Sequence, residues 1–460
     1  MQIPFGTRSY VNQSLPISAQ RLVNWYAEIQ PPDAGTQVAL LPCPGLVSFA
    51  TCGTGPIRGM VYMGSLVYVV SGSELYSLSS AGTATLLGSL TPSARVSIAD
   101  NGTQVFIACG SKGYIYSVAG GLVEITDADF PGADVVDFQD GYFIFNNPGT
   151  NQVFSTALYD GTSIDALDFA SAEAHPDNLI SLISDHRELW LFGAQSTEVW
   201  YNAGASAFPF ERTTTIEKGC IAKYSITKLD NSVFWLGTDP EAGGHMVYRA
   251  NGYEPVRISD HAIEAAISRY TTISDAFAWA YVRDGHAFYV LTFPTEKTCW
   301  VFDVASQRWH ERESYDEDRY RVNAFVAAFN KHLVGDYETG AIYYLDNDVY
   351  TDAGNAIVRT TTSPPIRNQD KYSAMSYLEA EFDHGVGLTS GQGSDPMAGL
   401  DWSDDGGRTW SNRLWMPIGK KGEYTRQTIW RRLGTWRGSR VFRITVSDPV
   451  KPVLLNVWAG

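Results

Sequence analysis

The chain has 460 residues, of which 44% are hydrophobic, 18% charged and 13% aromatic, and its formal net charge is −16. The apolar fraction suffices for a large buried core and excludes wholesale disorder, and the acidic excess argues against a general nucleic-acid coat protein. No run of about 18 apolar residues is present, which excludes a membrane-spanning helix. The first ten residues have neither a basic start nor an apolar stretch, so we expect no secretory signal.

The cysteines are five in number and widely scattered, without a C-x-x-C pair. Such a set predicts free thiols in a reducing compartment rather than a disulfide framework or a zinc site. The sequence therefore indicates a soluble, acidic protein that is made in the cytoplasm.

Residues 1–55 are rich in proline, which predicts an extended arm that packs on another surface. From about residue 56 to 360 the sequence alternates apolar and polar residues in short runs separated by turn residues. Asn101-Gly102 and Asp284-Gly285 are examples of these turns. Helical patterns are rare. The best one covers residues 262–268, with Asp260 as a possible cap.

The strand-rich units repeat at intervals of about 40–55 residues, which is the length of one propeller blade. They begin near residues 57, 94, 134, 178, 221, 276 and 321. We therefore predict an all-β fold in which residues 56–360 form a β-propeller of about seven blades. A series of β-sandwiches with similar strand spacing is the alternative.

Residues 361–460 differ in composition from the repeat. We expect them to form a C-terminal β-domain that makes up a platform together with the N-terminal arm. Between Arg408 and Arg443 there are ten basic residues and one acidic residue, Glu423, and the segment 361–460 has a net charge of +3 against −19 for residues 1–360. A solvated face would explain such a run. Because six Trp residues fall in the same segment, and Trp and Arg are enriched at interface hot spots, an assembly contact is the other explanation. We take Arg431, Arg432, Trp436 and Arg437 as the candidate contact residues.

One local motif matches a defined sequence pattern. Residues 403–410 fit the Asp-box pattern S-x-D-x-G-x-T-W, with Ser403, Asp405, Gly407, Thr409 and Trp410 at the defined positions. The Asp405 side chain can accept hydrogen bonds from its own turn, and Gly407 permits that turn. A single copy outside the repeat predicts a stable β-hairpin and is weak evidence for glycosidase activity.

Patterns for catalysis are missing. The eight histidines are dispersed and show no metal-ligand spacing, and there is no GxSxG, GxGxxG or GxxxxGK[ST] motif. We therefore assign no catalytic, cofactor-binding or metal-binding residue, and no small-molecule substrate.

An ordered series of segments resembles the packaged-DNA stabilisation proteins, the tail-hub or nozzle proteins of short-tailed phages related to P22. The segments are QRLVNWY at 20–26, LLPCPGL at 40–46, GPIRGM at 55–60, TEVWY at 197–201, FPF at 208–210, GC at 219–220, SVFWLG at 232–237, GHAFYVLTFP at 285–294, WHER at 309–312 and VGD at 334–336. The tail, with its Asp-box and GTWR at 434–437, resembles the C-terminal β-domain of such proteins.

The resemblance implies a virion structural protein of the tail, without enzymatic activity, that is made in the host cytoplasm. It implies a ring, expected to be a homo-hexamer, below the portal and its adaptor ring. Such a ring extends the DNA channel, retains packaged DNA, takes part in ejection and receives a needle, plug, fibre or spike. DNA would pass through an acidic lumen without specific binding.

Two other functions stay open at this point. The Asp-box and the many aromatic residues also fit a sialidase-like propeller that cleaves glycans, or a propeller that binds glycans without chemistry. The first would require clustered acids and arginines at one mouth of the propeller, and the second would require aromatic residues along an exposed groove.

Overall fold

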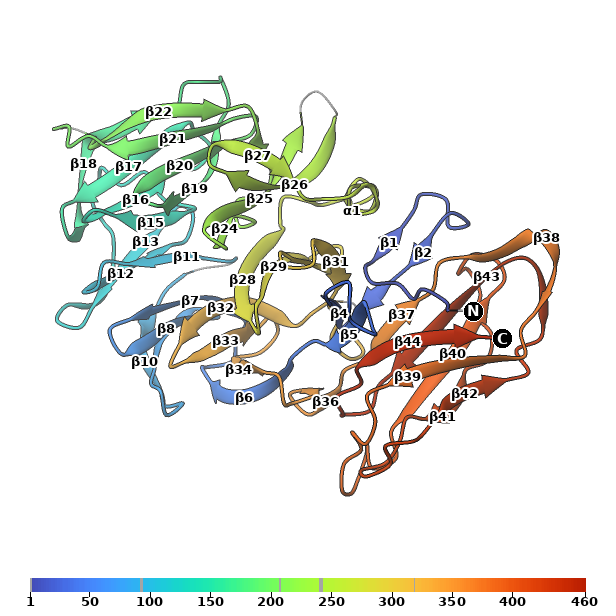
Figure 1. The fold of residues 1–460 in the computed structure, drawn as a ribbon. Coiled ribbons are helices and arrows are strands. Elements are labelled where there is room, and N and C mark those ends of the chain that lie inside the picture. Colours follow the sequence, from blue (N-terminus) through green and yellow to red (C-terminus); the bar gives the residue numbers. More distant parts are fainter. Residues whose placement is uncertain (1, 92–93, 207, 240–242, 318) are drawn as a thin grey trace.

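The computed structural model describes residues 2–91, 94–206, 208–239, 243–317 and 319–460, and it is almost entirely β-structure (Figure 1). Four antiparallel meanders in chain order form the first four blades of a propeller. Their strands are β7 (Ile57–Met63), β8 (Leu66–Ser71), β9 (Glu74–Leu78), β10 (Ala84–Ser89); β11 (Ser97–Asp100), β12 (Gln104–Ala108), β13 (Gly113–Ser117), β14 (Gly121–Glu124); β15 (Val136–Gln139), β16 (Tyr142–Asn146), β17 (Gln152–Ala157), β18 (Asp160–Ser171); and β19 (Leu179–Asp185), β20 (Glu188–Gly193), β21 (Thr197–Asn202), β22 (Phe210–Ile216).

Three further sheets complete the ring of blades. They contain β23 (Gly219–Cys220), β24 (Thr227–Leu229), β25 (Ser232–Asp239), β26 (Gly244–Asn251), β27 (Glu254–Arg257); β28 (Phe277–Arg283), β29 (His286–Phe293), β30 (Thr298–Asp303), β31 (Arg308–Glu311); and β32 (Val322–Ala328), β33 (Lys331–Asp336), β34 (Ala341–Asp346), with β35 (Thr351–Asp352) and β36 (Asn355–Ala356) at the margin. The expected helix is confirmed as α1 (His261–Ile267), and Asp260 accepts hydrogen bonds from the amides of Ala262 and Ile263.

The seventh blade takes its fourth strand from the other end of the chain. Strand β6 (Gly45–Thr51) pairs antiparallel with β34, so that Leu46 lies opposite Leu345. A buried core that joins Ile57 and Val69 of the first blade to Leu333 of the seventh then closes the circle. Seven such cores lie between the seven pairs of neighbouring blades, and the predicted seven-bladed propeller is confirmed.

This closure differs from the expected boundary, which assigned all of residues 1–55 to an arm outside the propeller. The segment 322–346 supplies only three strands, which leaves an open sheet edge in the seventh blade. An unpaired edge exposes unsatisfied backbone groups, and β6 pairs with them. Of the other residues in this segment, Trp25 and Leu40 belong to the core of the second domain, whereas Tyr26 and Cys43 pack in the core between the sixth and seventh blades.

The second domain is a β-sandwich of two sheets. One sheet has the order β4 (Trp25–Ile29), β5 (Val38–Pro42), β44 (Leu454–Ala459), β39 (Tyr377–Phe382), β42 (Thr428–Arg431). The other contains β3 (Leu22–Val23), β37 (Arg359–Thr362), β43 (Thr435–Val446), β40 (Met397–Ser403), β41 (Leu414–Pro417), and β38 (Ile366–Ala374) pairs with β43; β1 (Tyr10–Val11) and β2 (Ala19–Gln20) form a separate hairpin. Arm residues contribute to the core between the sheets, because Trp25 is fully buried there and donates its indole N–H to the Pro452 carbonyl.

The two domains share one continuous sheet, which passes from the sixth blade into the sandwich (Figure 1). Val23 of β3 pairs parallel with Glu311 of the blade, and Leu22 pairs with Thr361 of β37. Arg21 binds the Glu311 and Glu313 carboxylates beside this crossing, and its contact with Glu313 is 2.6 Å long. The domain junction is therefore formed by backbone pairing as well as by side chains.

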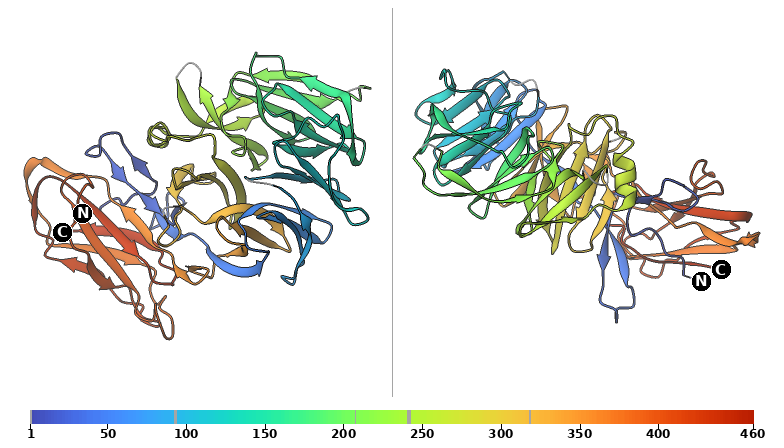
Figure 2. Two further views of the ribbon diagram at one scale, coloured as in Figure 1. Left: turned by 180° about the vertical axis from the view of Figure 1, so that it is seen from behind. Right: turned by 90° about the horizontal axis from the view of Figure 1, so that it is seen from above.

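The β4–β5 hairpin projects away from the common plane of the two domains, as Figure 2 shows in its right-hand view. Glu28, one pair before the loop end of this hairpin's ladder, contacts the propeller. His286 lies between two carboxylates, with Nε2 at 2.6 Å from Glu28 and Nδ1 at 2.9 Å from Asp303. Hydrogen bonds that His286 donates to the carboxylates of Asp303 and Glu28 raise its pKa to about 9, although burial opposes that increase. The imidazolium therefore links the arm to the sixth blade.

Among the described residues, no helix combines the length and the apolar character needed to cross a membrane.

We expect His286→Asn to lower the free energy of unfolding by about 2–4 kcal/mol at pH 6, the size implied by a pKa raised from 6.5 to about 9. Because the folded pKa is the higher one, this contribution is fully present below pH 6.5 and is lost as the pH rises through about 9. Chemical unfolding of both proteins at pH 6 and pH 10 measures the difference. The exposed His261→Asn is the control, and an equal penalty at both pH values would contradict the ion-pair link.

Candidate functional site

The Asp-box forms the loop between β40 and β41. Asp405 Oδ1 accepts hydrogen bonds from the amides of Arg408 and Thr409, both at 2.9 Å, and Oδ2 accepts from the Thr409 hydroxyl at 2.7 Å. These bonds hold the pKa of Asp405 far below its ordinary value. Ser403 Oγ accepts from the Gly407 amide at 2.8 Å, and Gly407 has φ +96°, which favours glycine. The motif thus holds its own turn by local hydrogen bonds.

This loop also holds the β1–β2 hairpin, residues 10–20, which we call the strap. The strap lies between α1 and the sandwich (Figure 1). A small cavity of about 180 Å³ separates the strap from Gly406, Gly407, Trp410 and Arg443. The Pro16 carbonyl accepts a hydrogen bond from Arg367 of β38. In this chain the Asp-box faces a segment of its own protein.

Many charges of the basic run are paired within the sandwich. Arg443 binds Asp401 through two hydrogen bonds of 2.9 and 2.6 Å, and Arg413 binds the same carboxylate at 3.2 Å. Arg440 binds Asp404 in the same two-pronged way, at 2.6 and 2.8 Å. Two-pronged Arg–carboxylate pairs are among the strong polar contacts in proteins. The acidic partners precede the basic run in sequence and meet it across β40 and β43.

The tryptophans take part in the same network. The Arg443 guanidinium lies 3.8 Å from the centre of the Trp410 ring, and Arg440 lies between Trp402 at 5.1 Å and Trp436 at 4.6 Å. Cation–π contacts of this kind contribute roughly 0.5–2 kcal/mol each. The joint enrichment in Trp and Arg is therefore largely internal to the sandwich.

The four predicted contact residues divide between surface and core. Trp436 is only 6% exposed and packs in the sandwich core, so its proposed role in a contact surface is wrong. Its apolar ring faces Phe442 on the same strand, and a buried position satisfies that ring better than solvent would. Arg431, Arg432 and Arg437 are exposed.

Arg431 and Arg432 lie at an end of the sandwich where both sheets have their last strand. Strand β41 is the edge of one sheet and β42 the edge of the other. Leu414 and Trp415 of β41 are 37% and 44% exposed, and Tyr424 in the intervening loop is 71% exposed. We call β41, β42 and residues 418–427 the open end. Exposed edges that carry aromatic and basic groups are suited to contacts with another chain.

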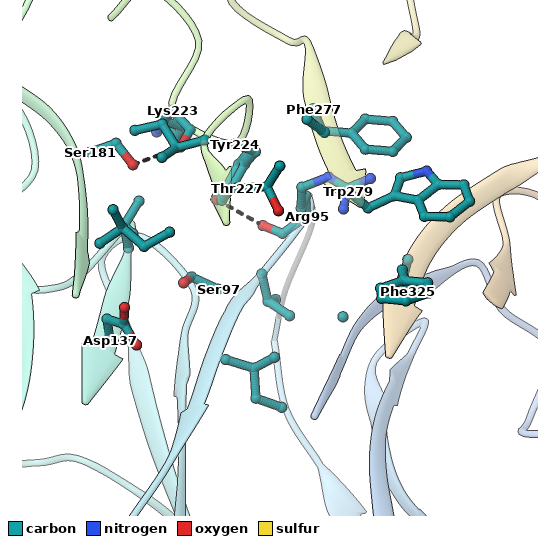
Figure 3. A pocket seen from close by; sticks show the side chains of 18 of the residues that line it. Arg95, Ser97, Asp137, Ser181, Lys223, Tyr224, Thr227, Phe277, Trp279 and Phe325 are labelled. Atoms are coloured by element: carbon teal, nitrogen blue, oxygen red, sulfur yellow. Dashed lines mark hydrogen bonds between the residues drawn. The ribbon is translucent and has the colours of Figure 1, made fainter. Parts of the chain in front are cut away.

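The bore of the propeller is narrow. Its cavity, about 450 Å³, is bordered by all seven innermost strands, β7, β11, β15, β19, β24, β28 and β32. Trp279 and Phe325 line it and stack at 5.1 Å in the core between the sixth and seventh blades, and the Arg95 guanidinium lies 3.7 Å from the centre of the Phe277 ring (Figure 3). The Tyr224 hydroxyl donates to the Arg95 carbonyl at 3.2 Å. A volume of this size suits a small molecule.

In the parts of the chain that the structure describes, no group of three or more His, Cys, Asp or Glu side chains could hold a metal ion. The five cysteines are unpaired, and four of them are buried. Burial raises the pKa of Cys220 and Cys299 to about 11, which keeps these thiols protonated at neutral pH.

Sequence reasoning missed Asp401 and Asp404 as the partners of the arginines. Asp401 lies directly opposite Arg443 in the pairing of β40 with β43. The signal is a cross-strand charge pair, which becomes visible only when the register of these two strands is known.

The fold and its surfaces define a structural β-protein, a seven-bladed propeller fused to a sandwich with an open end. Residues 1–350 match the family model described as Bacteriophage P22 Gp10, beta-propeller, and residues 359–459 match the model described as Bacteriophage P22 Gp10, beta-sandwich. The chain belongs to this family of phage stabilisation proteins, which confirms the resemblance and gives it a phage structural role.

Other comparisons add little. No curated protein matches the chain. Among solved structures, the Neurospora crassa Pan2 WD40 domain is 9% identical, covers 66% of this chain and 96% of that chain, and has a TM-score of 0.44. The β-propeller domain of Myceliophteria thermophila Cps50 (Swd1) is 10% identical, covers 65% and 99%, and has a TM-score of 0.45.

We expect Asp405→Ala to lower the melting temperature and to loosen the strap, because the turn loses its central acceptor. A protease of broad specificity should then cut residues 12–17 several-fold faster than in the unaltered protein. Asp395→Ala is the matched control, since Asp395 pairs with Lys420 at 3.4 Å and both side chains are about half exposed. Equal cleavage of the two variants would show that the Asp-box does not hold the strap.

Proposed function

We propose that this protein is the subunit of a ring in the phage tail, below the portal and its adaptor ring, where it extends the DNA channel and retains the packaged genome. The observation that carries the proposal is the family match, which spans both domains with little remaining outside them. The ring would be a homo-hexamer that takes part in ejection and receives a needle, plug, fibre or spike.

The geometry of the propeller supports a channel between subunits. A DNA duplex cannot pass through a bore whose cavity is only about 450 Å³. In a ring, the walls of several subunits would enclose a wider lumen on the symmetry axis.

The charge distribution is compatible with this arrangement. Residues 1–360 carry a net charge of −19, so walls formed by the propeller would repel phosphate rather than bind it. Tight binding of DNA depends on neutralising phosphates, and a conduit has to avoid that. We propose accordingly that DNA slides through without specific contacts.

The open end of the sandwich is our candidate for the contact with the adaptor or with a neighbouring subunit. Arg431 and Arg432 are exposed there, whereas Arg413, Arg440 and Arg443 are engaged with Asp401 and Asp404. Charged contacts at a rim steer association and weaken with salt. We propose no catalytic role, in keeping with a family of structural proteins.

Replacing both Arg431 and Arg432 with Glu tests the proposal. Folding should stay nearly intact, because exposed charges contribute about 0–1 kcal/mol each to stability. Addition of the variant to DNA-filled capsids should fail, and those capsids should lose their genome; electron microscopy and nuclease sensitivity of the DNA measure the two effects.

The control replaces Arg187 and Arg269 with Glu. Both are exposed on the propeller side, and Arg187 has φ +66°, close to the +62° of Arg432, so that backbone effects are matched. If the Arg431/Arg432 variant assembles and retains DNA as well as this control, the open end is a solvated face and the contact lies elsewhere.

A further inference from the structure

One mouth of the propeller contains a cavity that the proposed function does not use. It has a volume of about 600 Å³ and lies where the innermost strands begin, since its walls include residues just before β11, β15, β24 and β28. We call it the mouth cavity. Its volume falls within the range of small-ligand pockets.

Arg95 forms the floor of the mouth cavity and has no carboxylate partner among the described residues. Its Nη2 donates to the backbone oxygen and, at 2.9 Å, to the side-chain oxygen of Asn323, while the guanidinium stacks on Phe277. Its other guanidinium nitrogens have no protein acceptor in the described chain. Burial lowers the pKa of Arg95 to about 9, which reflects a charge that the protein itself leaves uncompensated.

Two more cations lie near Arg95, although only Lys223 lines the mouth cavity. Lys223 lines the cavity, bound to Asp134 at 2.7 Å, and its side chain is still 35% exposed. Arg319, which is 7% exposed, lies 5.9 Å from the Phe277 ring and leaves Nη2 buried without a partner in the described structure. An arginine held near other cations and short of acceptors is a receptor for an oxyanion.

Asp275 also lines the mouth cavity and offers an acceptor. Its Oδ2 accepts hydrogen bonds from the amide and the hydroxyl of Thr295, at 2.9 and 2.6 Å. Its Oδ1 is buried, and no described group donates to it. A buried acceptor without a donor costs about 1–3 kcal/mol, so a turn of the Asp275 side chain that brings Oδ1 to a ligand hydroxyl would be stabilising.

We propose that the mouth cavity binds a small hydroxylated anion, a sugar acid or a sugar phosphate. The anionic group lies on Arg95 and Lys223, and a hydroxyl of the sugar donates to Asp275. The cavity lining holds two cations and two carboxylates, and among these cations Arg95 is the one without a carboxylate partner in the described chain. The proposal rests on this cavity alone and does not depend on the assembly role.

Calorimetric titration of the full-length protein at constant ionic strength tests the binding. Glucuronate and glucose 6-phosphate are the two probes, and they separate a carboxylate from a phosphate head group. At least one should bind ten-fold or more tightly than glucose, and also more tightly than acetate or inorganic phosphate, which lack the sugar hydroxyls.

Arg95→Gln should weaken binding of that probe at least ten-fold. Since Arg95 also stacks on Phe277, Lys223→Gln provides a second test that leaves the stack intact, with an expected weakening of several-fold. Asp275→Ala should remove the preference for the sugar anion over acetate or phosphate. Lys228→Gln is the control, because Lys228 borders the bore outside the mouth cavity, near Asp137, and should leave binding unchanged.

Two results would overturn the proposal. One is binding of both probes no tighter than that of glucose. The other is equal binding by the unaltered protein and by the folded Arg95 and Lys223 variants, which would place the anion outside the mouth cavity.

Discussion

The pairing of β6 with β34 is the contact on which the rest of the architecture depends. Three strands cannot complete the seventh blade, and a propeller with one open edge would expose backbone groups that have no partner. Because the closing strand comes from residues 45–51, the chain enters the propeller at the seventh blade, traces the other six and returns to complete the seventh. Residues before β6 contact both domains, next to the residues that leave the propeller after β36.

The same route explains the continuous sheet between the domains. Strand β3 lies between β31 of the sixth blade and β37 of the sandwich, and it pairs with both. Two passages of the chain, before β6 and after β36, therefore cross the junction side by side. The Glu28–His286–Asp303 link and the Arg21–Glu311 pair add charged contacts where the backbone pairing already fixes the geometry.

The sequence predicted the parts of the fold that depend on local signals. Two-residue turns such as Asp140-Gly141 and Asp284-Gly285 have positive φ at both positions, as a type I′ turn requires, and the hairpins locate the blades. The turn at Asn101-Gly102 was predicted to be of the same type, but only Gly102 has positive φ, because Asn101 Oδ1 accepts from the amides of Thr103 and Gln104 and forms a longer loop.

Features that depend on distant pairing could not be predicted from the sequence. The role of β6 depends on a partner almost 300 residues away, and nothing within 45–51 distinguishes it from other apolar strands. The ion pairs of the basic run could not be predicted for the same reason. Asp401 and Arg443 are far apart in the chain and become opposite neighbours only through the register of β40 with β43. The composition suggested an interface, whereas much of the Trp and Arg content stabilises one domain.

The chain therefore presents two kinds of surface, one on the propeller and one at the open end of the sandwich. The propeller has no open edge at its closure and its bore is narrow, and its remaining edge strands, such as β10 and β22, are the outer strands of single blades. The sandwich retains edge strands at its open end, and among its arginines Arg431 and Arg432 are exposed at that end. Since a continuous sheet joins the two domains, any partner bound at the open end also fixes the direction in which the propeller points. A contact at one end of the molecule can thus position an acidic wall at the other.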